Sequence, residues 1–244
     1  MNVRQAANVL ELLEFFAQRG QPATLAEIAD GLGWPRSSTF NLVGTLAGRG
    51  YLYEPQGRAG YFPTARWLEM ARAIIASDPL PEGIEDSIAE LAAETGETVA
   101  LTAPAGVSAI FRHVVASSAP IRYSAEVGNL VPIHATSCGR ALLAQYSPSE
   151  RKSLYRKIDF VRFTNFTPGN ADEVEAILAR EMQQGFHLNV GGHVDGLQGV
   201  AMPLAIPGRP LALLIGGPTF RCSEQIPAFA AALRNALARI AKIG

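Results

Sequence analysis

Apolar residues recur at helical spacing in three short stretches at the start of the chain. The first covers residues 3–17. The second begins at Thr24, and Glu27 follows at the spacing of a capping box, in which each side chain binds a free backbone N–H at a helix start. The third begins at Pro35, because the first turn of a helix does not need the N–H that proline lacks, and it ends near Gly48. This order predicts a helix-turn-helix, although another small helical hairpin would show the same features.

Two short segments rich in aromatic residues follow directly. Residues 51–53 and 61–62 predict two strands, and residues 55–60 between them predict a turn. A helix-turn-helix followed at once by such a hairpin is a winged helix. Arg58 would then lie at the hairpin tip, where it can reach a DNA backbone or minor groove.

A further helix is predicted over residues 65–76, because Pro63 and Pro79 bound a run with helical apolar spacing. This position suits a connector between two domains. Its broad apolar surface would suit packing against a second chain, and packing against its own domain is an equal alternative.

The second half of the chain alternates between segments with strand and helix patterns. The predicted helices cover residues 84–95, 135–146, 148–155, 171–184 and 227–243. The predicted strands cover residues 97–103, 109–116, 121–125, 185–190, 199–206 and 211–216, with a loop at 129–132 and a hairpin turn at 207–210. Strands and helices mixed in this way predict an α+β domain with one largely antiparallel sheet.

Composition narrows the class of protein. Hydrophobic residues make up 48% of the 244 positions and charged residues 18%, which favours a folded core over disorder. No run of about 18 apolar residues is present, and no signal peptide precedes the first helix. Two cysteines, Cys138 and Cys222, form no disulfide framework. We therefore expect a cytoplasmic protein with no membrane partner.

The start of the third helix carries the candidates for DNA contact. Short hydroxyl groups suit phosphates, whereas Arg and Asn suit base edges in the major groove. The candidates are Arg36, Ser37, Ser38, Thr39 and Asn41, together with Arg58 of the hairpin. Phe40, Leu42, Val43 and Leu46 are expected to supply apolar packing. The net charge is only −1, so affinity for DNA must come from a local cluster and not from bulk attraction.

Two kinds of chemistry are disfavoured. His134 and Cys138 are four residues apart, as a base and a nucleophile on one helix face would be. Catalysis also needs an orienting group and an oxyanion site, and the sequence supplies neither, so a structural histidine is the preferred interpretation. The histidines and cysteines show no short zinc-site spacing, and we expect no metal, no cofactor and no catalytic residue.

Three segments, in order along the chain, carry a resemblance to a known family. They are PRSSTFNLVGTLAGRGYLY with the preceding TLAEIADGLG, then VPIHATSCGRALLAQYSPSE, then GVAMPLAIPGRPLALLIGGP. The whole chain resembles the IclR family of bacterial transcription regulators. The resemblance implies a winged-helix DNA-binding domain (1–62), a linker helix (63–79) and a GAF-like effector-binding domain (80–244). It also implies dimers or tetramers on operator DNA.

The resemblance places an effector site in the distal domain. The variable pair of the His-Ala segment is Ser137 and Cys138, at a helix start where N–H groups would point toward an anion. The other family positions fall on Asn189, Gly199, Leu214 and Gly216, and the loop that contains His193 would cover the site. Gly199 replaces a family cysteine, and Leu214 and Gly216 replace two serines. Fewer polar groups suit a glyoxylate-like acid poorly, so a bulkier, partly apolar ligand such as an aromatic carboxylic acid is expected.

Three functions stay open at this point. The first is a DNA-binding regulator whose operator binding responds to a small organic acid. The second is an enzyme with a GAF-like domain and an accessory winged helix. The third is a winged helix that binds proteins and not DNA. The motifs favour the first.

Overall fold

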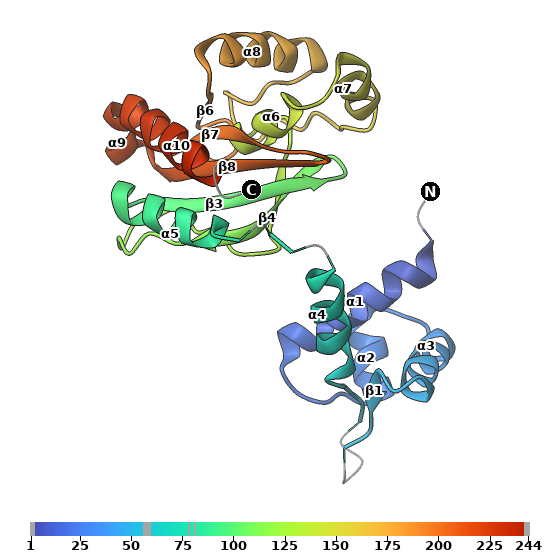
Figure 1. Ribbon diagram of the computed structural model, residues 1–244. Coiled ribbons are helices and arrows are strands. Elements are labelled where there is room, and N and C mark those ends of the chain that lie inside the picture. The colour runs from blue at the N-terminus through green and yellow to red at the C-terminus, as the bar shows by residue number, and fades with distance from the viewer. Residues whose placement is uncertain (1–2, 56–59, 78, 81, 242–244) are drawn as a thin grey trace. The chain divides into compact units, whose positions relative to one another are not determined.

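The computed structural model describes residues 3–55, 60–77, 79–80 and 82–241. The chain divides into two compact units, Met1–Pro79 and Leu80–Gly244. Figure 1 shows the course of the chain through both.

The N-terminal unit is a three-helix core with a short hairpin. Its elements are α1 (Arg4–Arg19), α2 (Leu25–Leu32), α3 (Arg36–Gly48), β1 (Leu52–Tyr53), β2 (Phe62–Pro63) and α4 (Arg66–Ala76). The capping box at the start of α2 is present, with Thr24 and Glu27 each binding the other's backbone N–H. Pro35 precedes α3 as its N-cap and does not lie inside the first turn, so this helix begins one residue later than predicted.

The hairpin is anchored to the start of α2. Tyr53 pairs with Phe62 across β1 and β2, and Ala23 forms an isolated bridge to Tyr61. Gly60 makes this approach possible, since a Cβ there would lie 2.2 Å from the Ala23 carbonyl carbon. The winged helix-turn-helix predicted from the sequence is therefore confirmed, while Arg58 at the predicted tip lies outside the described residues.

The C-terminal unit is built on a six-stranded sheet in the order β5-β4-β3-β8-β7-β6. The strands are β3 (Thr98–Ala105), β4 (Ser108–Val115), β5 (Leu130–Pro132), β6 (His187–Val190), β7 (Leu197–Ile206) and β8 (Arg209–Pro218). Every neighbouring pair is antiparallel. The α+β class with an antiparallel sheet is therefore confirmed.

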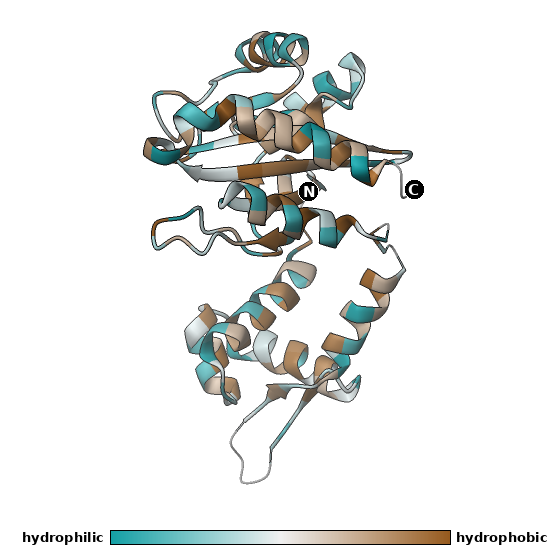
Figure 2. Ribbon diagram, turned by 60° about the vertical axis from the view of Figure 1, so that its left-hand side comes forward, coloured by the Kyte–Doolittle hydropathy of each residue, from teal (hydrophilic) through white to brown (hydrophobic). Residues whose placement is uncertain are grey.

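Helices cover both faces of this sheet (Figure 1). They are α5 (Ile84–Thr95), α6 (Ser137–Leu143), α7 (Pro148–Tyr155), α8 (Ala171–Gln184), α9 (Thr219–Cys222) and α10 (Ile226–Ile240). Successive strand residues point to opposite faces, so Val200 packs with α5 and α10 whereas Ala201 packs with α6 and α8. Figure 2 shows hydrophobic positions along the middle of the sheet. The two faces form two apolar cores.

One strand and one loop were assigned wrongly from the sequence. Residues 121–125 were predicted as a strand but have no regular structure, and residues 130–132 were predicted as a loop but form β5. β5 exists because Val131 pairs with Ala109 of β4, a partner twenty-two residues away that local patterning does not reveal. The helix predicted over 135–146 is shorter in the structure: α6 begins at Ser137, because Thr136 caps it through the Gly139 N–H, and it ends at Leu143.

Candidate functional site

The outer surface of α3 carries most of the predicted DNA-contacting residues. Ser37, Ser38 and Asn41 are exposed, and Arg36 begins the helix. Thr39 differs from the prediction: its side chain is fully buried and its hydroxyl donates to the Pro35 carbonyl at 3.1 Å. It therefore cannot reach a ligand on this surface.

The side chains of Arg36 and Phe40 also shape this surface. The Arg36 guanidinium lies 3.0 Å from Asp30 Oδ1 and 3.1 Å from Oδ2, so a carboxylate of α2 orients it at the helix start. Phe40 was predicted to pack in the core, but it is 63% exposed, whereas Val43 and Leu46 are buried as predicted. A groove beside α3 is lined by Arg4, Gln5, Asn8, Trp34, Pro35, Ser38, Asn41, Leu42 and Thr45.

A small cavity of about 40 Å³ lies in the C-terminal unit between α6 and the sheet. Its lining residues are Tyr123, Thr136, Ser137, Cys138, Asn189, His193, Val194, Leu197, Gln198, Gly199, Leu214 and Gly216. All seven residues that the resemblance assigned to an effector site are among them. Five lining residues were not predicted, and Tyr123 is the most notable because it lies in a segment wrongly predicted as a strand.

Two glycines form the floor of the cavity. Gly199 of β7 and Gly216 of β8 are paired across the sheet. A Cβ on Gly199 would lie 2.8 Å from Leu214 Cδ1 and 2.9 Å from Ser137 Oγ, and one on Gly216 would lie 2.8 Å from Tyr123 Cδ1. The missing side chains thus create the space for the Tyr123 ring and for any ligand.

The start of α6 forms the opposite wall. Gly139 allows it to approach the preceding loop, since a Cβ there would lie 2.1 Å from the Ile133 carbonyl oxygen. The first N–H groups of a helix have no hydrogen-bond partner within it. In α6 the Thr136 hydroxyl accepts one of them, the Gly139 N–H, at 3.2 Å. α6 has only seven residues, so its dipole is weak and a ligand must be held mainly by individual donors.

A buried ion pair fixes α6 to α8 and β6. Arg140 forms two 2.8 Å bonds to the Glu181 carboxylate and a third to the Leu188 carbonyl. Glu181 also contacts His187 Nδ1 at 2.8 Å. Burial raises the pKa of Glu181, but the bonds from His187 and Arg140 outweigh it and hold that pKa below its ordinary value. This charge network fixes α6, which carries Ser137, to β6, which carries Asn189.

The cavity is lined by neutral groups. Among the lining residues of the described chain there is no Asp, Glu, Lys or Arg. Burial lowers the pKa of His193, whose ring packs edge-on against Phe163 at 5.0 Å. Burial raises the pKa of the Cys138 thiol, which disfavours the nucleophilic thiolate. Such a site can bind a ligand through hydroxyl, amide and backbone donors, but it has no activated nucleophile.

The loop over the cavity is held by threonines. Thr164 donates to the Gly191 carbonyl at 2.7 Å, and Thr167 donates to the Gly192 carbonyl at 2.6 Å.

His134 is buried beside Phe160. The described residues contain no group of three or more His, Cys, Asp or Glu side chains placed to hold a metal ion. Within the same part of the chain, no helix is both long enough and apolar enough to cross a membrane.

A winged helix and an antiparallel sheet domain with a small, partly open cavity are the parts that a ligand-responsive DNA-binding regulator needs. Residues 5–55 match the IclR helix-turn-helix domain, and residues 73–242 match the family described as Bacterial transcriptional regulator IclR C-terminal. The chain belongs to the IclR family of bacterial transcriptional regulators. The curated relatives that it matches are named as transcriptional repressors.

Curated relatives cover most of the chain. The transcriptional repressor IclR of Escherichia coli is 26% identical over 228 residues, which span 91% of this chain and 83% of the relative. The acetate operon repressor of Salmonella typhimurium is 27% identical, with the same coverage of both chains.

Solved structures share the fold. An IclR homolog from Microbacterium hydrocarbonoxydans, complexed with 4-hydroxybenzoate, has a TM-score of 0.78 at 21% identity, with 97% of each chain covered. A transcriptional regulator from Rhodococcus sp. RHA1 has a TM-score of 0.77 at 24% identity, with 98% of this chain and 97% of that chain covered.

Proposed function

We propose that the cavity in the C-terminal unit is the effector site and that its occupation changes operator binding by the N-terminal unit. The observation that carries this proposal is that one cavity brings together all seven residues that the sequence analysis assigned to an effector site. They come from three separate parts of the chain, and chance proximity would not gather them. Tyr123 also lines this cavity.

The effector is a small organic acid with an apolar or aromatic part. Ser137, Asn189 and Tyr123 supply neutral donors, while Leu214 and the glycine floor supply apolar contact. A carboxylate here would be bound without a fixed positive charge. The homolog that is complexed with 4-hydroxybenzoate supports an aromatic acid as the first class to test.

The size of the cavity limits how such an acid binds. At about 40 Å³ it holds only a few waters, and a cavity of roughly 150 Å³ is known to admit benzene. A ring-sized effector therefore needs side chains to move outward. His193 and Val194 are the candidates, because they lie in the connection between β6 and β7 and Val194 is 45% exposed.

The DNA-binding surface consists of Arg36, Ser37, Ser38 and Asn41 on α3. Arg58, which lies outside the described residues, stays a sequence prediction as a further contact. Thr39 is left out because it is buried. Arg36 and Asn41 suit base edges, and the serines suit phosphates. Arg36 forms an exposed ion pair with Asp30, and DNA would have to replace Asp30 as its partner.

A dimer is proposed to couple the two activities, with residues 1–62 as the DNA-binding domain, 63–79 as the linker and 80–244 as the effector domain. Hydrophobic positions recur along α4 (Figure 2), and Leu68, Ile74 and Ile75 are more than half exposed. Exposed apolar patches of this kind mark association surfaces. Two recognition helices must meet half-sites about 34 Å apart or a multiple of it, so a change in dimer geometry alters operator affinity.

A panel of aromatic and aliphatic acids, including 4-hydroxybenzoate, tests the proposal. Thermal shift selects the acids that bind the wild-type chain, and a gel shift on the upstream promoter region measures their effect on DNA binding. The proposal expects an acid that raises the melting temperature and also changes the gel shift. It fails if acids that bind leave DNA binding unchanged.

A further inference from the structure

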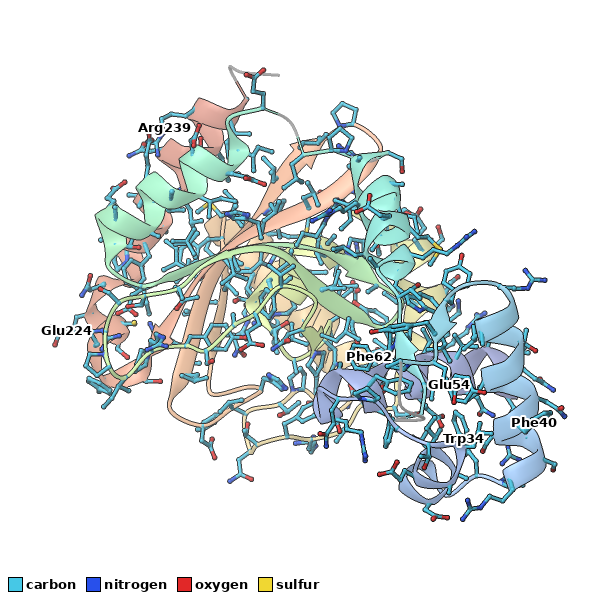
Figure 3. All side chains as sticks on the ribbon, turned by 90° about the horizontal axis from the view of Figure 1, so that it is seen from below. Trp34, Phe40, Glu54, Phe62, Glu224 and Arg239 are labelled. Atoms are coloured by element: carbon cyan, nitrogen blue, oxygen red, sulfur yellow. The ribbon has the colours of Figure 1, made fainter. Side chains whose placement is uncertain are left out.

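Phe40 is the exposed aromatic side chain of the recognition helix. It is 63% exposed and extends outward from α3, as Figure 3 shows. The buried face of α3 consists of Thr39, Val43 and Leu46, so Phe40 is not part of that core. Exposure of an aromatic ring on a helix that reads DNA points to a contact made outside the chain.

Gly44 lies one helical turn after Phe40 on the same side of the helix. Glycine is among the least favourable residues in a helix interior, so its presence there needs a reason. In α2 the reason is internal: a Cβ on Gly31 would lie 2.7 Å from the Phe15 ring. At Gly44, apart from its chain neighbours and the helix's own backbone, no described atom lies within 4 Å of an added Cβ. The space beside Phe40 is therefore kept open toward solvent, where a partner can approach the helix backbone.

The chemistry of the neighbours identifies the partner surface. Asn41 follows Phe40, and asparagine binds the N6 and N7 edge of adenine in the major groove. Thymine presents a C5-methyl group in the same groove, and phenylalanine is one of the side chains that contacts it. An aromatic ring beside an open glycine suits this methyl group, which no other standard base carries in DNA.

We propose that Phe40 contacts a thymine methyl group in each half-site and that Gly44 admits the base edge to that contact. This inference rests on the proposed DNA-binding role of α3 and adds the base that the helix selects. Phe40 is then a specificity-determining residue, and the operator carries an A·T pair at that position.

The test is a cycle that combines one protein change with one DNA change. The wild-type chain first selects a duplex from a random library. Each thymine in the part of the duplex that the protein covers is then replaced by deoxyuridine, which removes only the methyl group. Replacing one such thymine in a single half-site should weaken wild-type binding about four-fold, the equivalent of one buried methyl group. The same replacement should leave the affinity of Phe40→Ala unchanged, because the contact is already absent.

Gly44→Ala and Gly48→Ala form a matched pair of second variants. Both glycines lie in α3 and both have open space around an added Cβ. Gly44→Ala should keep or raise the melting temperature yet lose sensitivity to the deoxyuridine replacement. Gly48→Ala, one turn further from the leading end of the helix, should keep that sensitivity.

Each contrary outcome is informative. If every deoxyuridine replacement affects wild type and Phe40→Ala equally, the inference is overturned while DNA binding stands. If Phe40→Ala instead changes the sedimentation of the free protein and shows no coupling to a methyl group, Phe40 is a subunit contact and the inference is again wrong. If the wild-type chain selects no duplex at all, the proposed function of α3 falls with it.

Discussion

Gly199 and Gly216 face each other across β7 and β8 and together leave the floor of the proposed effector cavity without side chains. Neither glycine is required by its backbone, since neither has a positive φ. Each is required by what lies above it: Leu214 and Ser137 over Gly199, and Tyr123 over Gly216. The pair therefore makes room at the floor of the cavity for the side chains of Leu214, Ser137 and Tyr123.

Gly199→Val should block effector binding while the chain stays folded. The new side chain would occupy the floor and contact Ser137, so the Kd of the selected acid should rise at least ten-fold. Overpacking a core costs about 1–3 kcal/mol, which lowers the melting temperature without preventing folding. Calorimetry measures the affinity and circular dichroism measures the fold.

Ala205→Val is the matched control, because Ala205 lies on the same strand but is exposed. It should leave effector affinity at the wild-type value. If Gly199→Val binds the acid as tightly as Ala205→Val does, the assignment of the cavity is wrong.

The sequence predicts the helices of this fold better than the edge strand β5. The bounds of α5 and α8 agree with the prediction, because Gly96 and Gly185 end them in a left-handed conformation that glycine adopts readily. These are local signals. β5 depends on its pairing with β4, a contact between distant parts of the chain, and local patterning therefore misses it.

The same limit applies to the candidate sites. Ser137 and Asn189 could be assigned from the resemblance, but Tyr123 could not, because its place in the cavity depends on the room above Gly216. On α3 the sequence gives a helix period but does not fix which residues face the core. Phe40 was therefore assigned to the interior and Thr39 to the surface, the reverse of what the structure shows.

Binding of an acid should become tighter as the pH falls. Burial lowers the pKa of His193, so its ring is neutral in the free protein at neutral pH. A carboxylate in the cavity favours the protonated ring and raises that pKa in the complex, which then takes up a proton. Affinity should rise between about pH 8 and about pH 5 by up to ten-fold for each pKa unit of change.

Calorimetry across this pH range, in buffers of different ionisation enthalpy, measures both the affinity and the proton uptake. His193→Gln should bind with a flatter pH profile. A wild-type affinity that is constant over the range, with no proton uptake, would show that His193 does not face the ligand's carboxylate.

Arg36→Ala and Ser38→Ala should each weaken operator binding about ten-fold or more, since a good base or phosphate contact contributes about 1–3 kcal/mol. Effector affinity should stay unchanged because the cavity lies in the other unit. Gel shift and calorimetry on the same samples separate the two activities. Arg180→Ala, an exposed arginine of α8, controls for the loss of one positive charge. Loss of both activities in Arg36→Ala would contradict the division of labour between the units.

Arg140→Met should destabilise the C-terminal unit by about 3–5 kcal/mol, because it leaves the Glu181 carboxylate buried without its cation. Arg151 offers the matched control, since it binds Glu175 in the same two-bond geometry but Glu175 is 40% exposed. Arg151→Met should cost about 1 kcal/mol or less. Urea unfolding measures both, and equal losses would show that burial does not decide the strength of the Arg140 pair.

The central claim is that one small molecule in this cavity changes the affinity of α3 for DNA. The most direct measurement titrates labelled operator with the wild-type chain, with and without the selected acid, and then titrates the acid with and without operator. Linkage requires the same factor in both directions, typically 5- to 150-fold, and Gly199→Val should show no coupling. An acid that fills the cavity with its affinity unchanged by operator, and with operator affinity unchanged in return, would contradict the account.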